Sequence, residues 1–399
     1  MSQERKRFPA RPCPVCRGLQ VKLLYRQRFE QLSGVRLLDG YDVVICRDCG
    51  AGFADDVPPQ AVFDDYYRDL SKYDDGGQGR PAPVTVETRF REIAELIERF
   101  IPGPESRVFE IGCASGGLLK ALRDRGFHSL VGSDPSFACT RAAHEIHGIA
   151  SVTGTVFTVP RPEEPYDFLI LTGVMEHIHD LDGTVGRFHE LLAPNGRVYL
   201  EVPDASRYQP MVDAPFQEFS VEHINFFSRI SLSNLMQARG FRTIETGHTV
   251  RALHEVTCPC VFGVFEKTGS PEPIERDTIT ESGLAAYIEG CQAEDRRIRA
   301  LIAQALGPGE RLIVWGVGAH TLRLLANGGL DSARVALFVD SNPKYQQQEL
   351  RGVPVVRPAE LRDRQEPIMI SSRSFQTEIQ EQVRHGLGLS NRLVLLYQT

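Results

Sequence analysis

Two acidic residues flank a turn of small residues, and together they could hold a nucleoside. Glu110 stands just before the turn 112–117, and Asp134 ends the next apolar run. The turn carries no large side chain, so a ligand can approach its backbone closely. A dinucleotide would need its pyrophosphate over the following helix, whereas a cationic nucleoside without phosphates is better held by carboxylates. A glycine-rich turn alone is a weak signal, but the acid pair indicates a site for a cationic nucleoside.

The elements that must position these residues form a βαβ unit. The pattern predicts a strand over 108–111, a helix over 118–125 and a second strand that ends at Asp134. A further apolar run, 166–172, is typical of a central parallel strand that is buried on both faces. Ligands of open α/β sheets bind beyond the carboxyl ends of such strands. Glu176 and His177, which follow the run 166–172, are therefore expected in the same cleft.

This pattern resembles the S-adenosylmethionine motif of class I methyltransferases: Glu110, then the G-x-A-x-G turn over 112–116, then Asp134. The resemblance implies a Rossmann-like α/β core and S-adenosylmethionine as the cofactor. It places Glu110 near the ammonium group and Asp134 on the ribose hydroxyls. Thr155 and Val156 stand where this family often has an acid and an apolar residue beside adenine. The cofactor-binding residues expected on this basis are Glu110, Gly112, Ala114, Gly116, Asp134, Thr155, Val156 and Thr172.

Four of the nine cysteines form two C-x-x-C pairs, Cys13 with Cys16 and Cys46 with Cys49. Each pair places two thiolates on one turn, and two such turns joined by a hairpin complete a closed tetrahedral zinc site. A closed site has no open coordination position, so the predicted zinc is structural. A redox role is the competing interpretation, but neither pair has thioredoxin-like βαβ surroundings.

A second group of possible metal ligands lies in an apolar strand. His254, Cys258 and Cys260 could form a cluster, but a C-x-C sequence in a strand puts both thiols on one face of the sheet. We therefore interpret Cys258 and Cys260 as ordinary buried cysteines.

Length and charge limit the classes of function. A chain of 399 residues is expected to form two or three domains. The net charge of −7 provides no general basic surface for a phosphate backbone, so nucleic acid is not an expected partner. No run approaches the roughly 18 apolar residues of a membrane span, and residues 1–12 have no apolar signal region. We predict a soluble, cytoplasmic protein that does not bind membranes; the sequence does not predict its oligomeric state.

A second βαβ pattern lies near the C-terminus. Gly316, Gly318 and Ala319 open the backbone at a predicted helix N-terminus, where free N–H groups favour a phosphate. Together with His320, these residues are the predicted site for the nucleotide of a substrate. The alternative is a duplicate domain that binds nothing and only supports the first. The predicted domains are a zinc module with its connector (1–75), a cofactor domain (76–270) and a C-terminal α/β domain (271–399).

Glu222 and His223 begin the sequence EHINFFS, which resembles the EH-x-x-(F/Y)-F-S motif of sugar C-methyltransferases. Those enzymes act on nucleotide-linked deoxysugars. They have a four-cysteine zinc domain before the methyltransferase core and a second Rossmann-like α/β domain after it, which is the module order of this whole chain. The chain departs from the family in two places: 219–221 lacks the usual Tyr-His pair, and Glu176 precedes the histidine of the cleft.

The resemblance implies a chemistry for the acceptor. Methylation of a carbon next to a ketone requires removal of a proton, for which a histidine is well suited. We expect His223 as the base, oriented by Glu222, with His177 and Tyr73 as hydrogen-bond donors to the substrate. Tyr73 lies in a loop-like part of the connector, whereas Tyr66 and Tyr67 are expected to pack against the core.

Two other functions remain open on the sequence alone. The first is O- or N-methylation of a sugar or a secondary metabolite, for which the same histidine would deprotonate the acceptor and no ketone is needed. The second is a nucleic-acid-binding zinc-ribbon protein with an inactive methyltransferase fold, against which the acidic balance argues.

Overall fold

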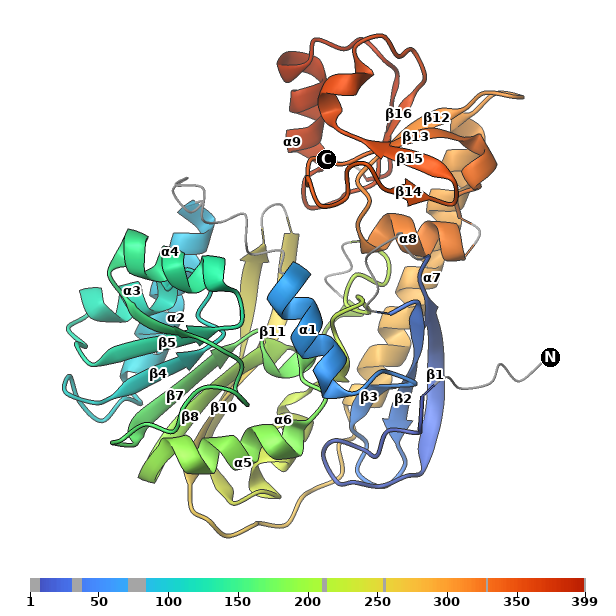
Figure 1. Cartoon of the computed structure of the whole chain (residues 1–399). Helices are drawn as coiled ribbons and strands as arrows, with labels where there is room; N and C mark the ends of the chain where they lie inside the picture. The colour runs from blue at the N-terminus through green and yellow to red at the C-terminus, as the bar shows by residue number, and fades with distance from the viewer. Residues whose placement is uncertain are drawn as a thin grey trace.

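The computed structural model describes residues 8–30, 38–70, 84–209, 214–253, 256–327 and 329–397, and arranges their strands in three sheets (Figure 1). Two residues singled out in the sequence, Tyr73 and His254, lie outside these ranges. Within them, no helix combines the length and the apolar character that a membrane crossing requires.

The N-terminal sheet combines strands from two distant parts of the chain. Its order is β1-β2-β3-β9, and every neighbouring pair is antiparallel. The strands are β1 (Val21–Arg28), β2 (Gly40–Cys46), β3 (Gly52–Asp55) and β9 (Asn225–Phe226). Since β9 begins two residues after His223, the sheet that carries the cysteines also fixes the segment of that histidine.

The connector after β3 contains a helix that sequence reasoning missed. Helix α1 spans Gln60–Leu70. No glycine or proline interrupts it, and Phe63 and Tyr67 lie one turn apart on the same face. Phe63 is fully buried and Tyr67 packs against the same core cluster. This packing stabilises the helix although its sequence is acidic and polar.

The central sheet has the order β10-β11-β8-β7-β4-β5-β6, in which β4 to β8 are parallel and β10 and β11 are antiparallel. Its strands are β4 (Val108–Ile111), β5 (Leu130–Asp134), β6 (Ala150–Thr153), β7 (Tyr166–Thr172), β8 (Leu192–Pro203), β10 (Phe241–Leu253) and β11 (Val256–Lys267). The strands predicted over 108–111 and 166–172 are confirmed. The chain places β5 and β6 on one side of β4 and then returns to add β7 and β8 on the other. The strand order thus reverses between β4 and β7, which is where open α/β sheets bind ligands.

Helices cover both faces of the central sheet (Figure 1). One face packs on α2 (Val84–Glu98), α3 (Gly117–Asp124) and α4 (Phe137–His147), and the other on α5 (Leu181–Leu191) and α6 (Arg229–Gln237). This is the doubly wound, Rossmann-like arrangement that the sequence predicts.

The long helix α7 (Thr280–Ala305) connects the N-terminal sheet to a third sheet (Figure 1). The third sheet has the order β14-β15-β13-β12-β16-β17. Its strands are β12 (Leu312–Trp315), β13 (Val335–Val339), β14 (Glu349–Leu350), β15 (Val353–Val356), β16 (Ile368–Ile370) and β17 (Leu393–Leu395), with helices α8 (Ala319–Ala326) and α9 (Gln376–Glu381). A buried ion pair between Arg323 of α8 and Asp295 of α7, with N–O distances of 2.7 Å, joins the helix to this part.

Candidate active site

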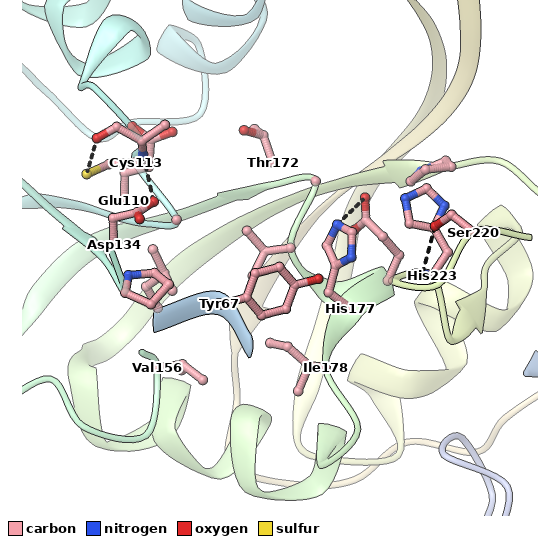
Figure 2. A pocket seen from close by; sticks show the side chains of 18 of the residues that line it. Tyr67, Glu110, Cys113, Asp134, Val156, Thr172, His177, Ile178, Ser220 and His223 are labelled. Atoms are coloured by element: carbon pink, nitrogen blue, oxygen red, sulfur yellow. Dashed lines mark hydrogen bonds and ion pairs between the residues drawn. The ribbon is translucent and has the colours of Figure 1, made fainter. Parts of the chain in front are cut away.

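A cavity of about 480 Å³ lies beyond the carboxyl ends of β4 and β7. It therefore occupies the position where the strand order reverses. Figure 2 shows Glu110 and Asp134 at one end of the cavity and His177 and His223 at the other. Tyr67 of α1 lies between the two groups in this view.

At the first end, Asp134 holds the small-residue turn in shape. Its Oδ2 accepts a hydrogen bond from the Ala114 N–H at 3.0 Å, and its Oδ1 accepts one from the Ser136 N–H at 2.9 Å. Gly112 has a φ of +79°, and a Cβ there would lie 2.6 Å from the Val174 side chain. Only glycine fits this position, because a side chain would be strained and would meet the end of β7. The turn is thus held open toward the cavity.

Glu110 is a buried acid, and one of its carboxylate oxygens has no hydrogen-bond donor among the described residues. It is 2% exposed, and that oxygen is Oε2. Burial raises the pKa of Glu110 from 4.5 to about 8, the charge of Arg89 lowers it, and the charge of Asp134 raises it further. A cationic ligand beside Glu110 would favour the ionised form and satisfy the free oxygen. The carboxylate therefore fits the ammonium group of S-adenosylmethionine.

The raised pKa of Glu110 predicts a pH effect on the stability of the ligand-free protein. Between pH 4.5 and about 8 the unfolded chain loses this proton while the folded chain keeps it, so the free energy of unfolding decreases as pH rises. The variant Glu110→Gln should lose less thermal stability than the wild type between pH 6 and 9, as measured by calorimetry. Glu163→Gln, at an exposed site, is the control. Equal pH dependence in the wild type and Glu110→Gln would contradict this assignment.

At the second end, two histidines meet in front of a buried acid. His177 belongs to a 3₁₀ turn (Met175–His177) after β7, and its ring centre lies 4.9 Å from that of His223. Its Nδ1 is 3.1 Å from the carbonyl oxygen of Glu222, which can only accept, so Nδ1 carries the hydrogen. Its Nε2 lies 3.8 Å from Oε1 of Glu176. The Tyr67 ring packs edge-on against His177 at 5.7 Å.

The orienting role of Glu222 stays a prediction, and the structure shows a second carboxylate beside His223. Glu222 accepts a hydrogen bond from the Tyr66 hydroxyl at 3.0 Å, whereas the carboxylate beside the His223 ring is that of Glu218, with its Oε2 3.7 Å from Nδ1. The backbone N–H groups of Glu222 and His223 both donate to the Ser220 hydroxyl at 3.2 Å. This turn directs the two neighbouring side chains to different partners.

Residues outside the cavity fix the two histidine segments to each other. The Asn225 side chain donates to the carbonyls of Met175 and Ile178, both at 2.8 Å. The buried Arg11 donates to the carbonyls of His179 at 2.8 Å and Ile224 at 3.0 Å. Burial lowers the pKa of Arg11 to about 10, so it remains charged at neutral pH. The N-terminal module thus fixes the end of the cavity that carries His177 and His223.

The four cysteines of the two C-x-x-C pairs come together in one cluster. Their sulfur atoms all lie within 4.8 Å of one another, with Cys13–Cys49 and Cys16–Cys46 separations of 3.5 Å. Four sulfurs around zinc at about 2.3 Å would lie roughly 3.8 Å apart. The cluster is therefore compatible with zinc. Cys258 and Cys260 are buried, as the sequence predicts.

Most of the predicted cofactor residues line this cavity. Those in its wall are Glu110, Gly112, Ala114, Asp134, Thr155, Val156 and Thr172. Gly116 is not among the lining residues, since a Cβ on it would point at Ala143 and Ile149 at 3.1 and 3.4 Å. Its role is close packing of α3 against α4 rather than ligand contact.

The predicted nucleotide site in the third sheet needs one correction. His320 is buried, and its Nδ1 and Nε2 lie 3.1 Å from the hydroxyls of Ser371 and Tyr397. Burial lowers the pKa of His320 to about 3, and both ring nitrogens already have partners. His320 therefore belongs to the core of this part and does not point at a ligand. Gly316 has a φ of +103°, and Gly318 is the N-cap residue of α8, which begins at Ala319.

The turn after β12 repeats the geometry of the turn after β4. Asp340 accepts from the N–H groups of Val317 and Asn342, both at 2.8 Å, as Asp134 accepts from those of Ala114 and Ser136. A carboxylate at the end of the second strand thus ties down both turns.

Several lining residues were not predicted. Tyr67, Glu218, Arg251 and Phe375 all contribute to the wall, and Phe375 immediately precedes α9 in the C-terminal part. Arg251 donates to Glu201 at 2.6 Å. The spacing of Phe63 and Tyr67 was a signal for helix α1. The irregular segment around Glu218 carried no such signal.

Comparison with known families decides the class of enzyme. Residues 86–246 match a family described as a methyltransferase domain. This range contains all of β4 and β7 and most of the residues that line the cavity. The chain contains a methyltransferase domain. Residues 309–395 of this methyltransferase match a second family, described as C2185-like, N-terminal. A comparison with curated proteins found no match.

Solved structures similar to this methyltransferase include enzymes with different named activities. Magnesium protoporphyrin IX methyltransferase from Synechocystis with bound SAH is 14% identical, with 52% of this chain and 99% of that chain covered and a TM-score of 0.39. The 1,6-didemethyltoxoflavin-N1-methyltransferase from Burkholderia thailandensis is 19% identical, with 56% and 97% covered and a TM-score of 0.42. The [4+2]-cyclase SpnF is 13% identical, with 53% and 98% covered and a TM-score of 0.42. Similarity at this level says nothing about the acceptor.

Proposed function

We propose that this methyltransferase methylates a carbon next to the ketone of a nucleotide-linked deoxysugar. The observation that carries the proposal is the single cavity with two chemically different ends. One end presents the buried carboxylate of Glu110 and the turn held by Asp134. The other presents the imidazoles of His177 and His223. A donor cation and an ionisable acceptor would therefore meet inside one cavity.

The chemistry of carbon methylation requires that the acceptor lose a proton. In this proposal Nε2 of His223 accepts the proton from the carbon next to the ketone, and the enolate carbon attacks the methyl group of the sulfonium. The C–H bond breaks, the C–CH₃ bond forms, and S-adenosylhomocysteine leaves. Glu218, 3.7 Å from Nδ1, would stabilise the imidazolium that results. In this proposal His177 and Tyr67, whose ring centres lie 5.7 Å apart, would both contact the acceptor.

A nucleotide-linked substrate is supported by the third sheet. In the turn that contains Gly316 and Gly318, the Asp340 carboxylate accepts two hydrogen bonds from backbone N–H groups. The Asp134 carboxylate accepts the same pattern of hydrogen bonds in the turn after β4. Phe375 reaches from this part into the wall of the cavity and is 38% exposed. We propose that residues 271–399 hold the nucleotide while residues 76–270 hold the donor. A substrate with a sugar at one end and a nucleotide at the other would extend between them.

The four-cysteine cluster has a structural role in this proposal. Zinc bound by Cys13, Cys16, Cys46 and Cys49 would hold the N-terminal turns in place and supply no chemistry at the acceptor. Its effect on the reaction would pass through Arg11 and β9, which fix the segments of His177 and His223.

The test is to follow the methyl group. The protein should transfer it from ¹³C-methyl-labelled S-adenosylmethionine to a nucleotide-linked 4-keto-deoxysugar, and ¹³C NMR should show a new methyl signal bonded to carbon. A methyl signal bonded to oxygen or nitrogen would contradict carbon methylation while keeping the enzyme class. Incorporation into acceptors without a nucleotide, at equal rates, would contradict the role of residues 271–399.

A further inference from the structure

We propose that Glu176, His177 and His223 together form a binding site for a divalent transition-metal cation at the acceptor end of the cavity. This site is separate from the four-cysteine cluster, and it goes beyond the proposed function, which needs no metal there. Each of the three residues offers one ligand atom, and these atoms lie within 4.8 Å of one another. All three residues line the cavity.

The spacing is close to that of a bound cation. Around a metal with bonds of about 2.1 Å, neighbouring ligand atoms lie roughly 3 to 3.5 Å apart. Nε2 of His177 and Oε1 of Glu176 are already 3.8 Å apart, and the two imidazole centres are 4.9 Å apart. Small side-chain rotations would bring the three atoms onto one ion. The backbone would not need to move, since the Ile224 N–H already donates to the Glu176 carbonyl at 2.8 Å and so joins the two segments.

Glu176 gives an independent reason to expect a ligand. It is 3% exposed, and among the described residues its Oε2 has no hydrogen-bond partner. A buried carboxylate oxygen without a partner is costly. The guanidinium in the same wall, that of Arg251, pairs with Glu201 at 2.6 Å. A cation between Glu176 and the histidines would satisfy the free oxygen.

The histidine contacts have the arrangement typical of metal ligands. A ligating imidazole usually donates its second N–H to a carbonyl or a carboxylate, which directs the other nitrogen at the metal. His177 donates through Nδ1 to the Glu222 carbonyl at 3.1 Å, which leaves Nε2 with its lone pair. Nδ1 of His223 lies 3.7 Å from the Glu218 carboxylate. In His177, Nε2 is then the nitrogen that would bind the cation.

Two imidazoles and one carboxylate suit first-row cations such as Mn²⁺, Fe²⁺, Co²⁺ or Zn²⁺ and leave coordination positions open. An oxygen of the acceptor could occupy one of them, and the cation would then stabilise the enolate or alkoxide that forms. Under these conditions His223 is a ligand, and the acceptor's proton would pass to the Glu218 carboxylate in the cavity wall. The chain thus has a second way to activate the same acceptor.

The test is Co²⁺ binding by the full chain with its cysteine cluster loaded with zinc. We expect one additional Co²⁺ per chain by calorimetry, with weak visible absorption and none of the intense thiolate bands that the cysteine cluster would give. Glu176→Gln and, from a different segment, His223→Gln should each weaken this binding about tenfold or more. Glu163→Gln, at an exposed site, should bind Co²⁺ as the wild type does.

The inference would be overturned by wild-type protein that binds no Co²⁺ beyond the cysteine cluster. It would also be overturned if Glu176→Gln and His223→Gln kept their circular dichroism spectra and bound Co²⁺ like the wild type. Either result would contradict the metal site but not the proposed function, which is tested separately by methyl transfer. If the protein transfers the methyl group in the presence of a chelator, with no cation bound at this site, the metal is not required and His223 acts as a simple base.

Discussion

Replacing His223 by asparagine should lower the rate of methyl transfer roughly 10²- to 10⁴-fold, the range that loss of a general base produces. The His223 imidazole lies 3.7 Å from the Glu218 carboxylate in the wall of the cavity. Asparagine keeps much of the side-chain volume but can neither accept the proton nor become an imidazolium. Donor affinity should change little, because Glu110 and Asp134 lie at the other end of the cavity (Figure 2). The measurement is single-turnover transfer from labelled S-adenosylmethionine.

The matched control for this variant is His128→Asn, because His128 is exposed on the loop between α3 and β5. It should react like the wild type. If His223→Asn kept both methyl transfer and the exchange of the acceptor's acidic proton with solvent, activation of the acceptor by His223 would be ruled out. The metal inference predicts the same loss of rate, so Co²⁺ binding distinguishes the two mechanisms.

Replacing Cys16 and Cys46 together by serine should release the zinc and destabilise the N-terminal sheet. Two of the four ligands would be lost, and structural zinc often supplies a large part of the folding free energy of its module. If the free energy of unfolding decreases by a few kcal/mol, the thermal midpoint of a domain of roughly 150 to 250 residues decreases by roughly 10 °C. Activity should fall as well, because the module clamps the segments of His177 and His223 through Arg11.

The measurements are zinc content per chain and the calorimetric midpoint. Cys139→Ser is the control, because Cys139 is buried like Cys46 but lies in α4, away from the cluster. Zinc-free wild-type protein, or a double variant with an unchanged midpoint, would contradict a structural zinc site.

The sequence was sufficient to predict the strands and the turn that form the Glu110 end of the cavity. Strand β4, the turn after it and the acid at the end of β5 are contiguous in the chain, so local patterns carry all the information. The cysteine pairs were equally clear, because their spacing is set by the turn that each pair forms.

The acceptor half depends on contacts between distant segments, which no local pattern reports. Strand β9 has only two residues and exists because β3 offers it a hydrogen-bonding edge. Glu218 reaches His223 through an irregular segment whose position depends on Tyr287 of α7. His320 follows a glycine-rich turn, as a ligand contact might, yet the packing of Ser371 and Tyr397 turns it inward.

The central claim is that the cavity beyond the carboxyl ends of β4 and β7 holds S-adenosylmethionine with Glu110 on its ammonium group. The most direct measurement is calorimetric titration with S-adenosylmethionine. We predict one site per chain in the wild type and a loss of affinity of roughly tenfold or more in Glu110→Gln, the size expected when a buried charged contact is removed. No binding to the wild type, or equal binding to Glu110→Gln, would contradict it.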